Sequence, residues 1–295
     1  MPRDPATGPM SDPEVPMPDR EVPMPDPEVP MPDREVPMSD REVPMPDREV
    51  ERALVVVAHP DDIDFGSAGT IAGWTSVGIE VTYLLVTTGD AGGFDDAVAR
   101  TDLPAMRMAE QRAAGAEVGV HDVRFLGHPL PDGSPNGDPQ PDGFVEVTPE
   151  LRRDISRVIR QVRPNRVLVS SPEWNLARMP VCHPDHMHTG EATLRAVYPD
   201  ARNPYSHVEL LRDEGLEPWT VHEIWVQGGR ENNHVSDVTA HVDVKMRALA
   251  AHASQFPQGF GPIEELVRAW MGGTATDAGL AEGSSAEIFD VHHIG

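Results

Sequence analysis

The sequence predicts an α/β fold in which helices flank a mostly parallel sheet. Residues 53–58 and 79–86 are short, valine-rich runs without polar alternation, which is typical of central parallel strands that are covered on both faces. Between such runs lie segments with apolar residues at helical spacing, as in residues 151–162. This repeated alternation of strand and helix favours a Rossmann-like arrangement.

The predicted elements follow in regular order. After the strand at 53–58, the small residues of 66–77 are sufficient for one crossover helix before the strand at 79–86. Further strands are predicted at 123–126, 167–169 and 223–226, and further helices at 103–118, 151–162, 191–197 and 242–253. Ligands of such sheets gather beyond the carboxyl ends of the strands, near the switch in strand order. Candidate site residues are therefore expected there.

The first fifty residues have a different composition, since they hold fourteen of the 31 prolines and seven of the 13 methionines. The unit Glu-Val-Pro-Met-Pro-Asp-Arg runs five times from Glu14 to Arg48, with variations at Pro27 and Ser39. A seven-residue period suggests a coiled coil, but the prolines remove backbone donors and block a helix. Residues 1–51 are therefore predicted to form a disordered or polyproline-like tail, and residues 52–295 a single folded domain.

Charge and composition limit the class of partner. A formal net charge of -25 repels nucleic acid and anionic lipid, because phosphate binding needs clustered lysine and arginine. The sequence contains neither a signal segment nor an apolar run of the roughly 20 residues that span a bilayer. The single cysteine, Cys182, fits a reducing compartment. We expect a cytoplasmic protein without membrane insertion; a homo-oligomer remains open.

Two short segments carry the residues most suited to chemistry. Ala58-His59-Pro60-Asp61-Asp62 follows the first predicted strand, and Cys182-His183-Pro184-Asp185-His186 follows the fourth after a loop. A His-Pro-Asp turn arises easily by chance, but two of them beyond parallel strands indicate a site. Zinc takes imidazole and carboxylate ligands, and a catalytic site typically has three of them and an open position. The residues alone do not decide which of the two adjacent aspartates faces the metal.

From residue 54 to its end the chain resembles the LmbE-like, or PIG-L, family of zinc-dependent N-deacetylases. The segments 58–62 and 183–186 match the two metal-site motifs of that family. Weaker similarities occur in the family's order, and they are 88–93, Arg107 with Glu110, 125–127 and 251–255. The resemblance implies an LmbE-like deacetylase domain at 52–295 that removes an N-acetyl group from an amino sugar or its conjugate, a small molecule.

The resemblance also implies roles for individual residues. His59, Asp62 and His186 would bind Zn²⁺, Asp61 would be the general base, and His183 would stabilise the oxyanion. We further expect Asp185 to orient His183, and Asp90 and Arg107 to contact substrate, although Asp90 could equally cap a turn and Arg107 pair with Glu110. Family members that act on mycothiol precursors carry a tyrosine where this chain has Val181. Iron, cobalt and manganese also suit two histidines and an aspartate.

Two competing hypotheses remain. A nucleotide-dependent oxidoreductase on the same fold would require Gly-x-Gly-x-x-Gly in the first turn, where this chain has His-Pro-Asp-Asp. A binding or scaffold protein acting through the repeat tail is the alternative from another class. Deletion of residues 1–50 distinguishes the deacetylase hypothesis from the scaffold hypothesis, because an enzyme would keep its deacetylase activity and a scaffold would lose its biological effect.

Overall fold

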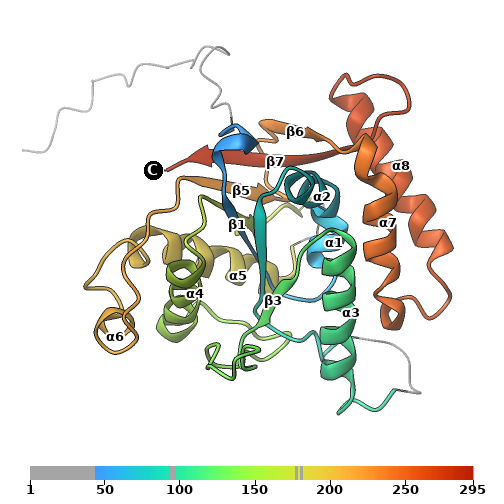
Figure 1. The fold of residues 1–295 in the computed structure, drawn as a ribbon. Helices are drawn as coiled ribbons and strands as arrows, with labels where there is room; N and C mark the ends of the chain where they lie inside the picture. Colours follow the sequence, from blue (N-terminus) through green and yellow to red (C-terminus); the bar gives the residue numbers. More distant parts are fainter. Residues whose placement is uncertain (1–43, 93–97, 177–178, 180–181, 295) are drawn as a thin grey trace, which may run out of the picture. The chain divides into compact units, whose positions relative to one another are not determined.

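The computed structural model describes residues 44–92, 98–176, 179 and 182–294. Within this part of the chain, seven strands form one sheet in the order β3-β2-β1-β4-β5-β7-β6 (Figure 1). The first five strands along the chain pair in parallel, and β7 pairs antiparallel with both β5 and β6. The predicted mostly parallel α/β sheet is confirmed. The strand bounds are β1 Arg52–Val57, β2 Glu80–Leu85, β3 Asp122–Phe125, β4 Arg166–Ser170, β5 Glu223–Gln227, β6 His234–Asp237 and β7 Ala286–His293.

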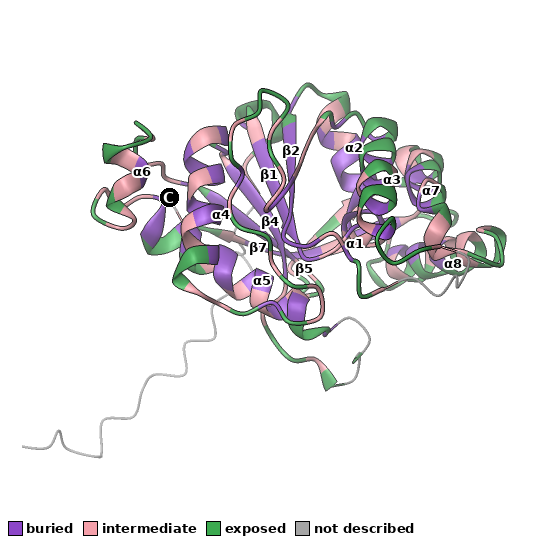
Figure 2. Cartoon of the chain, turned by 90° about the horizontal axis from the view of Figure 1, so that it is seen from below, coloured by how far each residue is buried: buried purple, intermediate pink, exposed green. Residues whose placement is uncertain are grey.

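Helices cover both faces of the sheet. The helix bounds are α1 Asp62–Gly66, α2 Ala68–Ser76, α3 Leu103–Glu117, α4 Pro149–Val162, α5 Pro184–Arg195, α6 Val208–Arg212, α7 Val242–Ala250 and α8 Gly261–Asp277. Val55 of β1 packs in a core cluster with residues of α2, α3 and α7, whereas its neighbour Val56 packs in a second cluster with residues of α4 and α5. Successive strand residues point to opposite faces, so the uninterrupted apolar run of β1 fills both layers (Figure 2).

The order of the strands creates a switch point between β1 and β4. The chain proceeds from β1 outward through β2 to β3, and then returns to place β4 on the other side of β1. The register pairs Val56 with Val169 near the carboxyl ends of these two strands. The segments that follow β1 and β4 therefore begin beside each other, although more than a hundred residues separate them in the sequence.

Several elements differ from the prediction. The helix expected at 66–77 is α2, but α1, which precedes it, was not predicted, and the helix expected at 191–197 begins earlier, at Pro184. Proline suits the first turn of a helix because its missing N–H has no intrahelical partner there. The strands β6 and β7 and the helices α6 and α8 had no counterpart in the prediction. Among the described residues, no helix is both long and apolar enough to cross a membrane.

The last residues of the repeat segment are described from Pro44, whereas residues 1–43 of the expected tail lie outside the described part of the chain. Asp47–Glu49 form one 3-10 turn, and Val50 is buried at the edge of the first core cluster. Ordered contacts of the domain therefore begin before residue 52, at Met45, which packs against the same cluster.

Candidate active site

The two His-Pro-Asp segments meet beyond the carboxyl ends of β1 and β4. His59 lies two residues after β1, and Asp62 is the first residue of α1. His183 caps the amino end of α5, and both Asp185 and His186 lie in the first turn of that helix. The two segments therefore lie at the switch in strand order, where candidate site residues were expected.

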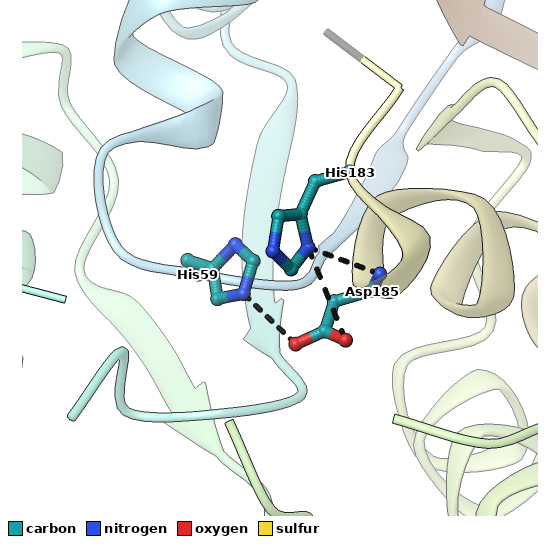
Figure 3. A group of neighbouring side chains, drawn as sticks. All are labelled: His59, His183 and Asp185. Atoms are coloured by element: carbon teal, nitrogen blue, oxygen red, sulfur yellow. Dashed lines mark hydrogen bonds and ion pairs between the residues drawn. The ribbon is translucent and has the colours of Figure 1, made fainter. Parts of the chain in front are cut away.

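The ring of His59 lies at the centre of the site. Its Nδ1 faces Nε2 of His186 at 3.1 Å and a carboxylate oxygen of Asp62 at 3.6 Å. Its Nε2 faces carboxylate oxygens of Asp142 at 2.9 Å and Asp185 at 3.1 Å, the latter drawn in Figure 3. The two nitrogens thus differ in surroundings: Nδ1 is turned to the other candidate metal ligands, and Nε2 to two further carboxylates.

His59, Asp62 and His186 form a group that could hold a metal ion. The carboxylate of Asp62 faces both imidazoles through different oxygens, one of which lies 3.0 Å from Nε2 of His186 and the other 3.6 Å from Nδ1 of His59. Zinc bonds of 2.0 to 2.2 Å at tetrahedral angles separate ligand atoms by about 3.3 to 3.5 Å. The separations between these side chains, 3.0 to 3.6 Å, are close to that spacing. The backbone N–H of His59 also donates to Asp62, which fixes the carboxylate.

A second group, His59, His183 and Asp185, also has three donor atoms close together (Figure 3). In this group, the carboxylate of Asp185 and Nδ1 of His183 already accept hydrogen bonds from the protein. Asp185 accepts hydrogen bonds from the backbone N–H groups of Gly143 and Val145, at 2.7 and 3.1 Å, as well as facing His59. Nδ1 of His183 accepts the backbone N–H of Asp185 at 3.2 Å. This group therefore suits structural support better than metal binding.

The position of Asp185 differs from the expectation that it orients His183. Its carboxylate is fully buried and lies 3.9 Å from Nδ1 of His183, farther than from the His59 ring. Burial by itself would raise the pKa of Asp185, but the hydrogen bonds from His59 and from the two backbone N–H groups lower it overall. Asp185 is thus a carboxylate that holds the ring of His59.

His183 presents one ring nitrogen to solvent. Because Nδ1 accepts the Asp185 N–H, the neutral ring carries its proton on Nε2. Partial burial lowers the pKa of His183, and the nearby His59 and His186 add to that effect. Its side chain is 45% exposed. A neutral ring with a free N–H donor therefore borders the candidate metal ligands.

Asp61 has an unusual backbone conformation, with φ at 82° in the left-handed region. Its N–H donates to the Gln111 side chain at 2.8 Å, and its carboxylate receives Nη2 of Arg107 at 3.3 Å. Burial and the neighbouring Asp62 raise the pKa of Asp61 to about 6, although Arg107 opposes the rise. A carboxylate with such a pKa is suited to accept a proton near neutral pH.

Arg107 is an internal residue rather than an exposed substrate contact. It is 4% exposed, and its guanidinium donates to the carbonyl oxygens of Gly89 and Pro60 as well as to Asp61. A Cβ atom at Gly89 would lie 2.1 Å from Nη1 of Arg107, so only glycine leaves room for the guanidinium. Glu110, the alternative partner, binds the backbone and hydroxyl of Ser254 instead.

The remaining predicted residues are easily placed. Asp90 is exposed in the loop after β2, where its carboxylate accepts the Thr88 hydroxyl at 3.3 Å, as a residue that caps a turn does. Val181, where a tyrosine would stand in some relatives, lies outside the described residues. The arrangement therefore leaves the side chain of Asp90 free to meet a ligand, while that of Arg107 is committed to the loop and to Asp61.

Carboxylates dominate the charge of the site. Asp61, Asp62, Asp142 and Asp185 gather around the histidines, and the hydrogen bonds that the His59 ring donates to carboxylates outweigh burial and raise the pKa of His59 to about 12. Burial would raise the pKa of Asp62, but the ion pair with His186 and the hydrogen bonds from both histidines lower it well below its usual value. Such an excess of negative charge around two imidazoles is the electrostatic environment that a divalent cation compensates.

Sequence reasoning missed Asp142, Gln111 and a buried pair beneath the site. Asp64 is fully buried, and its carboxylate faces Nε2 of His252 at 2.8 Å and the Gln111 amide at 2.8 Å. Burial lowers the pKa of His252, but Asp64 reverses this and raises it overall. The pair thus fixes Gln111, which in turn holds the backbone of Asp61. The earlier interpretation of His252 as structural agrees with these contacts.

A pocket of about 640 Å³ opens beside the candidate metal ligands. Asp62 and His186 line one part of it, and the side chains of α8 line another. The α8 residues in its wall are Leu266, Val267, Trp270, Met271 and Thr274. Two aromatic residues, Phe65 and Trp270, line this pocket, and Trp270 is 44% exposed.

The fold and the site together define an α/β protein with a candidate metal site at the switch point of its sheet. Residues 54–197, which include both His-Pro-Asp segments, match the PIG-L family, described as GlcNAc-PI de-N-acetylase. The chain is 32% identical over 210 residues to the diacetylchitobiose deacetylase of Thermococcus kodakarensis, covering 71% of this chain and 72% of the relative.

Two further comparisons agree. The chain is 30% identical over 210 residues to a probable N-acetyl-alpha-D-glucosaminyl L-malate deacetylase 2 of Bacillus anthracis, covering 69% of this chain and 80% of the relative. It superposes on the N,N'-diacetylchitobiose deacetylase of Pyrococcus horikoshii with a TM-score of 0.72 and 25% identity, over 84% of this chain and 85% of that one. The chain belongs to the PIG-L family, and it is an N-deacetylase.

Proposed function

We propose that this enzyme removes the N-acetyl group of an amino sugar or its conjugate at a zinc ion held by His59, Asp62 and His186. The observation that carries this proposal is the grouping of one donor atom from each of these residues, with separations between the side chains close to those of a tetrahedral site. The surrounding carboxylates and the carboxylate-bound Nε2 of His59 support it, because a ligating histidine usually donates its other N–H to such a group.

A zinc ion bound there supplies a Lewis acid that polarises the amide carbonyl and lowers the pKa of a water molecule. Asp61 takes the proton of the attacking water, since its pKa of about 6 leaves it ionised yet basic at neutral pH. Arg107 and Gln111 hold the carboxylate and the backbone of Asp61 in place before substrate arrives. The strained backbone at Asp61 is maintained by these contacts.

His183 completes the proposed set of groups. Its Nε2–H donates a hydrogen bond to the oxygen that becomes negative as the amide carbon turns tetrahedral. The cap formed with the Asp185 N–H fixes the tautomer needed for this, so the ring does not have to be protonated. The proton held by Asp61 passes to the nitrogen as its bond to the acyl carbon breaks, so that the amine leaves neutral and acetate remains.

The pocket beside the ligands supports a substrate larger than an acetamide. Its mixed lining of polar groups at the sheet and apolar side chains from α8 matches a sugar ring, which has polar edges and an apolar face. Trp270 is the proposed stacking platform. The relatives are named as deacetylases of diacetylchitobiose and of an N-acetylglucosaminyl malate, and N-acetylglucosamine conjugates are accordingly the proposed substrates.

An amine-release screen tests this function. The protein is loaded with zinc and checked by elemental analysis. It is then incubated with N-acetylglucosamine, with the inositol and malate conjugates of N-acetylglucosamine, with diacetylchitobiose, and with glycopeptide pseudoaglycones. We expect free amine from at least one of them, and none from the His186→Ala variant. Absence of amine from every compound would contradict the proposed substrate class, whereas a metal content unchanged in His186→Ala would contradict the metal site.

The identity of the metal and the cellular location of the enzyme are also parts of the proposal. Iron, cobalt and manganese also bind two imidazoles and a carboxylate, so activity is to be compared after loading with each metal. A cytoplasmic location is supported by the buried free thiol of Cys182. The scaffold alternative predicts that deacetylation is irrelevant to the biological effect, and a tail deletion that keeps activity but removes the effect would favour it.

A further inference from the structure

The end of the repeat segment binds a groove at the amino ends of β1, β4 and β5, opposite to the active-site end of the sheet. Arg166 and Glu223 are the first residues of β4 and β5, and both side chains are fully buried. The segment that occupies this groove is Pro44–Val50, with the sequence Pro-Met-Pro-Asp-Arg-Glu-Val. We call residues 44–50 the docked heptapeptide.

Glu223 and Arg166 bind the docked heptapeptide through specific polar contacts. The backbone N–H of Met45 donates to a carboxylate oxygen of Glu223 at 2.6 Å, and the carbonyl of Met45 accepts Nη2 of Arg166 at 2.9 Å. The carboxylate of Asp47 accepts Nη1 of Arg166 at 2.9 Å. At the far end, Val50 is 5% exposed within the core cluster. The groove therefore recognises a methionine, an aspartate two residues later and a valine three residues after that.

The guanidinium of Arg166 is held rigidly by its neighbours. The Arg166 guanidinium lies 4.8 Å from the ring centre of Trp74 and 4.6 Å from that of Trp225, and its Nε donates to Glu223. Stacking and ion pairing fix the planar guanidinium, so that its outer nitrogens point at the peptide. A pre-formed donor pair of this kind selects a carboxylate and a carbonyl at a set spacing.

The docked heptapeptide is one of several copies in the chain. Residues 16–22 and 30–36 have the identical sequence, residues 23–29 differ only at Pro27, and residues 37–43 differ only at Ser39. Residues 9–15 form a further copy, with Ser11 and Pro13 at the same two variable places. The three positions that the groove recognises, methionine, aspartate and valine, are the same in all six copies. The variable positions correspond to Pro46 and Arg48. In the described part of the chain, the hydrogen bonds of Arg166 and Glu223 to the docked heptapeptide are made by Met45 and Asp47.

We propose that upstream copies of the heptapeptide bind this groove in a second molecule of the chain, so that the repeat segment links copies of the enzyme. Exchange of one identical segment for another retains every contact of the groove, as in domain swapping. The difference between the two states is the tether, which gives the chain's own copy a high effective concentration. Five upstream copies per chain and a high local concentration of chains favour the exchange.

The test uses full-length chains. An acceptor whose own copies are disabled carries alanine at each recognised aspartate, by the substitutions Asp12→Ala, Asp19→Ala, Asp26→Ala, Asp33→Ala, Asp40→Ala and Asp47→Ala. It is labelled at its amino terminus and mixed with unlabelled wild-type chain as donor. Analytical ultracentrifugation should detect complexes of acceptor and donor, because the donor carries five intact upstream copies in addition to the one that fills its own groove.

Two matched controls identify the groove. A donor that keeps Asp47 but has alanine at the five upstream aspartates should bind the acceptor at least roughly tenfold more weakly, since the charged hydrogen bonds to Arg166 are lost. An acceptor in which only Asp47 is restored should also bind more weakly, because its groove is refilled. Deacetylase activity reports that the acceptor is folded, since the groove lies at the other end of the sheet. A folded acceptor that stays monomeric with every donor overturns the proposal.

A second measurement does not depend on the acceptor. Free peptide of sequence Pro-Met-Pro-Asp-Arg-Glu-Val is added to the wild-type chain, and the average mass is followed by analytical ultracentrifugation. We expect the mass to fall towards that of a monomer, with no effect of a peptide that has asparagine in place of aspartate. Equal effects of the two peptides, or none from either, would contradict recognition of the heptapeptide.

Discussion

Nε2 of His59 lies 2.9 Å from a carboxylate oxygen of Asp142. Asp142 reaches this position from the long loop between β3 and α4, and the backbone N–H of Gly143, the next residue, donates to Asp185. One loop thus supplies Asp142 and also hydrogen-bonds Asp185 of α5, the other carboxylate that faces the His59 ring.

We predict that Asp142→Asn weakens metal binding by about 10- to 100-fold, because the ring of His59 loses a carboxylate partner that raises its basicity. Zinc affinity is measured by competition with a chromophoric chelator. Asp138→Asn is the matched control, since Asp138 lies in the same loop but its carboxylate pairs with the exposed side of Arg153. Equal affinities in the two variants would show that the contact to His59 does not matter.

Asp61→Asn should retain zinc and lose activity by about 10²- to 10⁴-fold, because the amide cannot accept the proton of the attacking water. Turnover and metal content are measured on the same preparation. His186→Ala is the counterpart, in which metal content itself should fall. If Asp61→Asn turned over at close to the wild-type rate, another group would have to be the base.

The pH dependence follows from the same residue. The proposed base acts as a carboxylate, and burial raises the pKa of Asp61 to about 6, so kcat/KM should fall as the pH decreases through about 6 and level off above it. Arg107 lowers the pKa of Asp61, and Arg107→Gln should therefore move this limb to higher pH. Arg112→Gln, on the same helix but exposed, is the control. An unchanged limb in Arg107→Gln would contradict the coupling of the two residues.

Trp270→Ala should raise KM for a sugar substrate several-fold and leave kcat nearly constant, because the ring is proposed to stack on the sugar and takes no part in the chemistry. The magnitude corresponds to about 0.5 to 1.5 kcal/mol. Tyr205→Ala removes an exposed aromatic ring that does not line the pocket, and serves as control. A fall in kcat without a change in KM would argue against a role in binding.

Removal of residues 1–40 should leave the unfolding temperature unchanged, whereas removal of residues 1–50 should lower it. The longer deletion takes away Asp47 and the Met45 carbonyl and leaves buried Arg166 with fewer partners, at a cost of about 1 to 3 kcal/mol. Calorimetry of both deletions measures this. The result also places the domain boundary, for which the sequence predicted residue 52; equal stabilities would support that residue.

The parallel half of the fold was predictable because its signals are local. Apolar runs such as 53–58 and helical spacing such as that of 151–162 identify elements without knowledge of their neighbours. The antiparallel edge was not predictable, because β6 is a four-residue strand whose apolar Val235 is exposed, and α8 contains Gly272 and Gly273, which disfavour helix. Those elements are stabilised by tertiary packing, through residues such as Val267 and Met271.

The candidate site divides in the same way. The residues of the two His-Pro-Asp segments were identified from short motifs, and the fold brings both segments together. Asp142 could not be found, since nothing in its neighbourhood resembles a motif, and its position depends on loop contacts such as Asn136 with Phe125. Asp185 was found, but the ring nearest its carboxylate depends on how α5 meets β1, which one sequence does not reveal.

Gly89 belongs to segment 88–93, which matches the family weakly. It affects the site because it has no side chain. The space where a Cβ would be is filled by the Arg107 guanidinium, which also faces Asp61. In a saturation mutagenesis experiment, Gly89 should therefore behave as an active-site position, with every substitution displacing the cation and so altering the protonation of a carboxylate that Gly89 itself never contacts. Intolerance to mutation at a residue without functional groups would then report on chemistry rather than on folding.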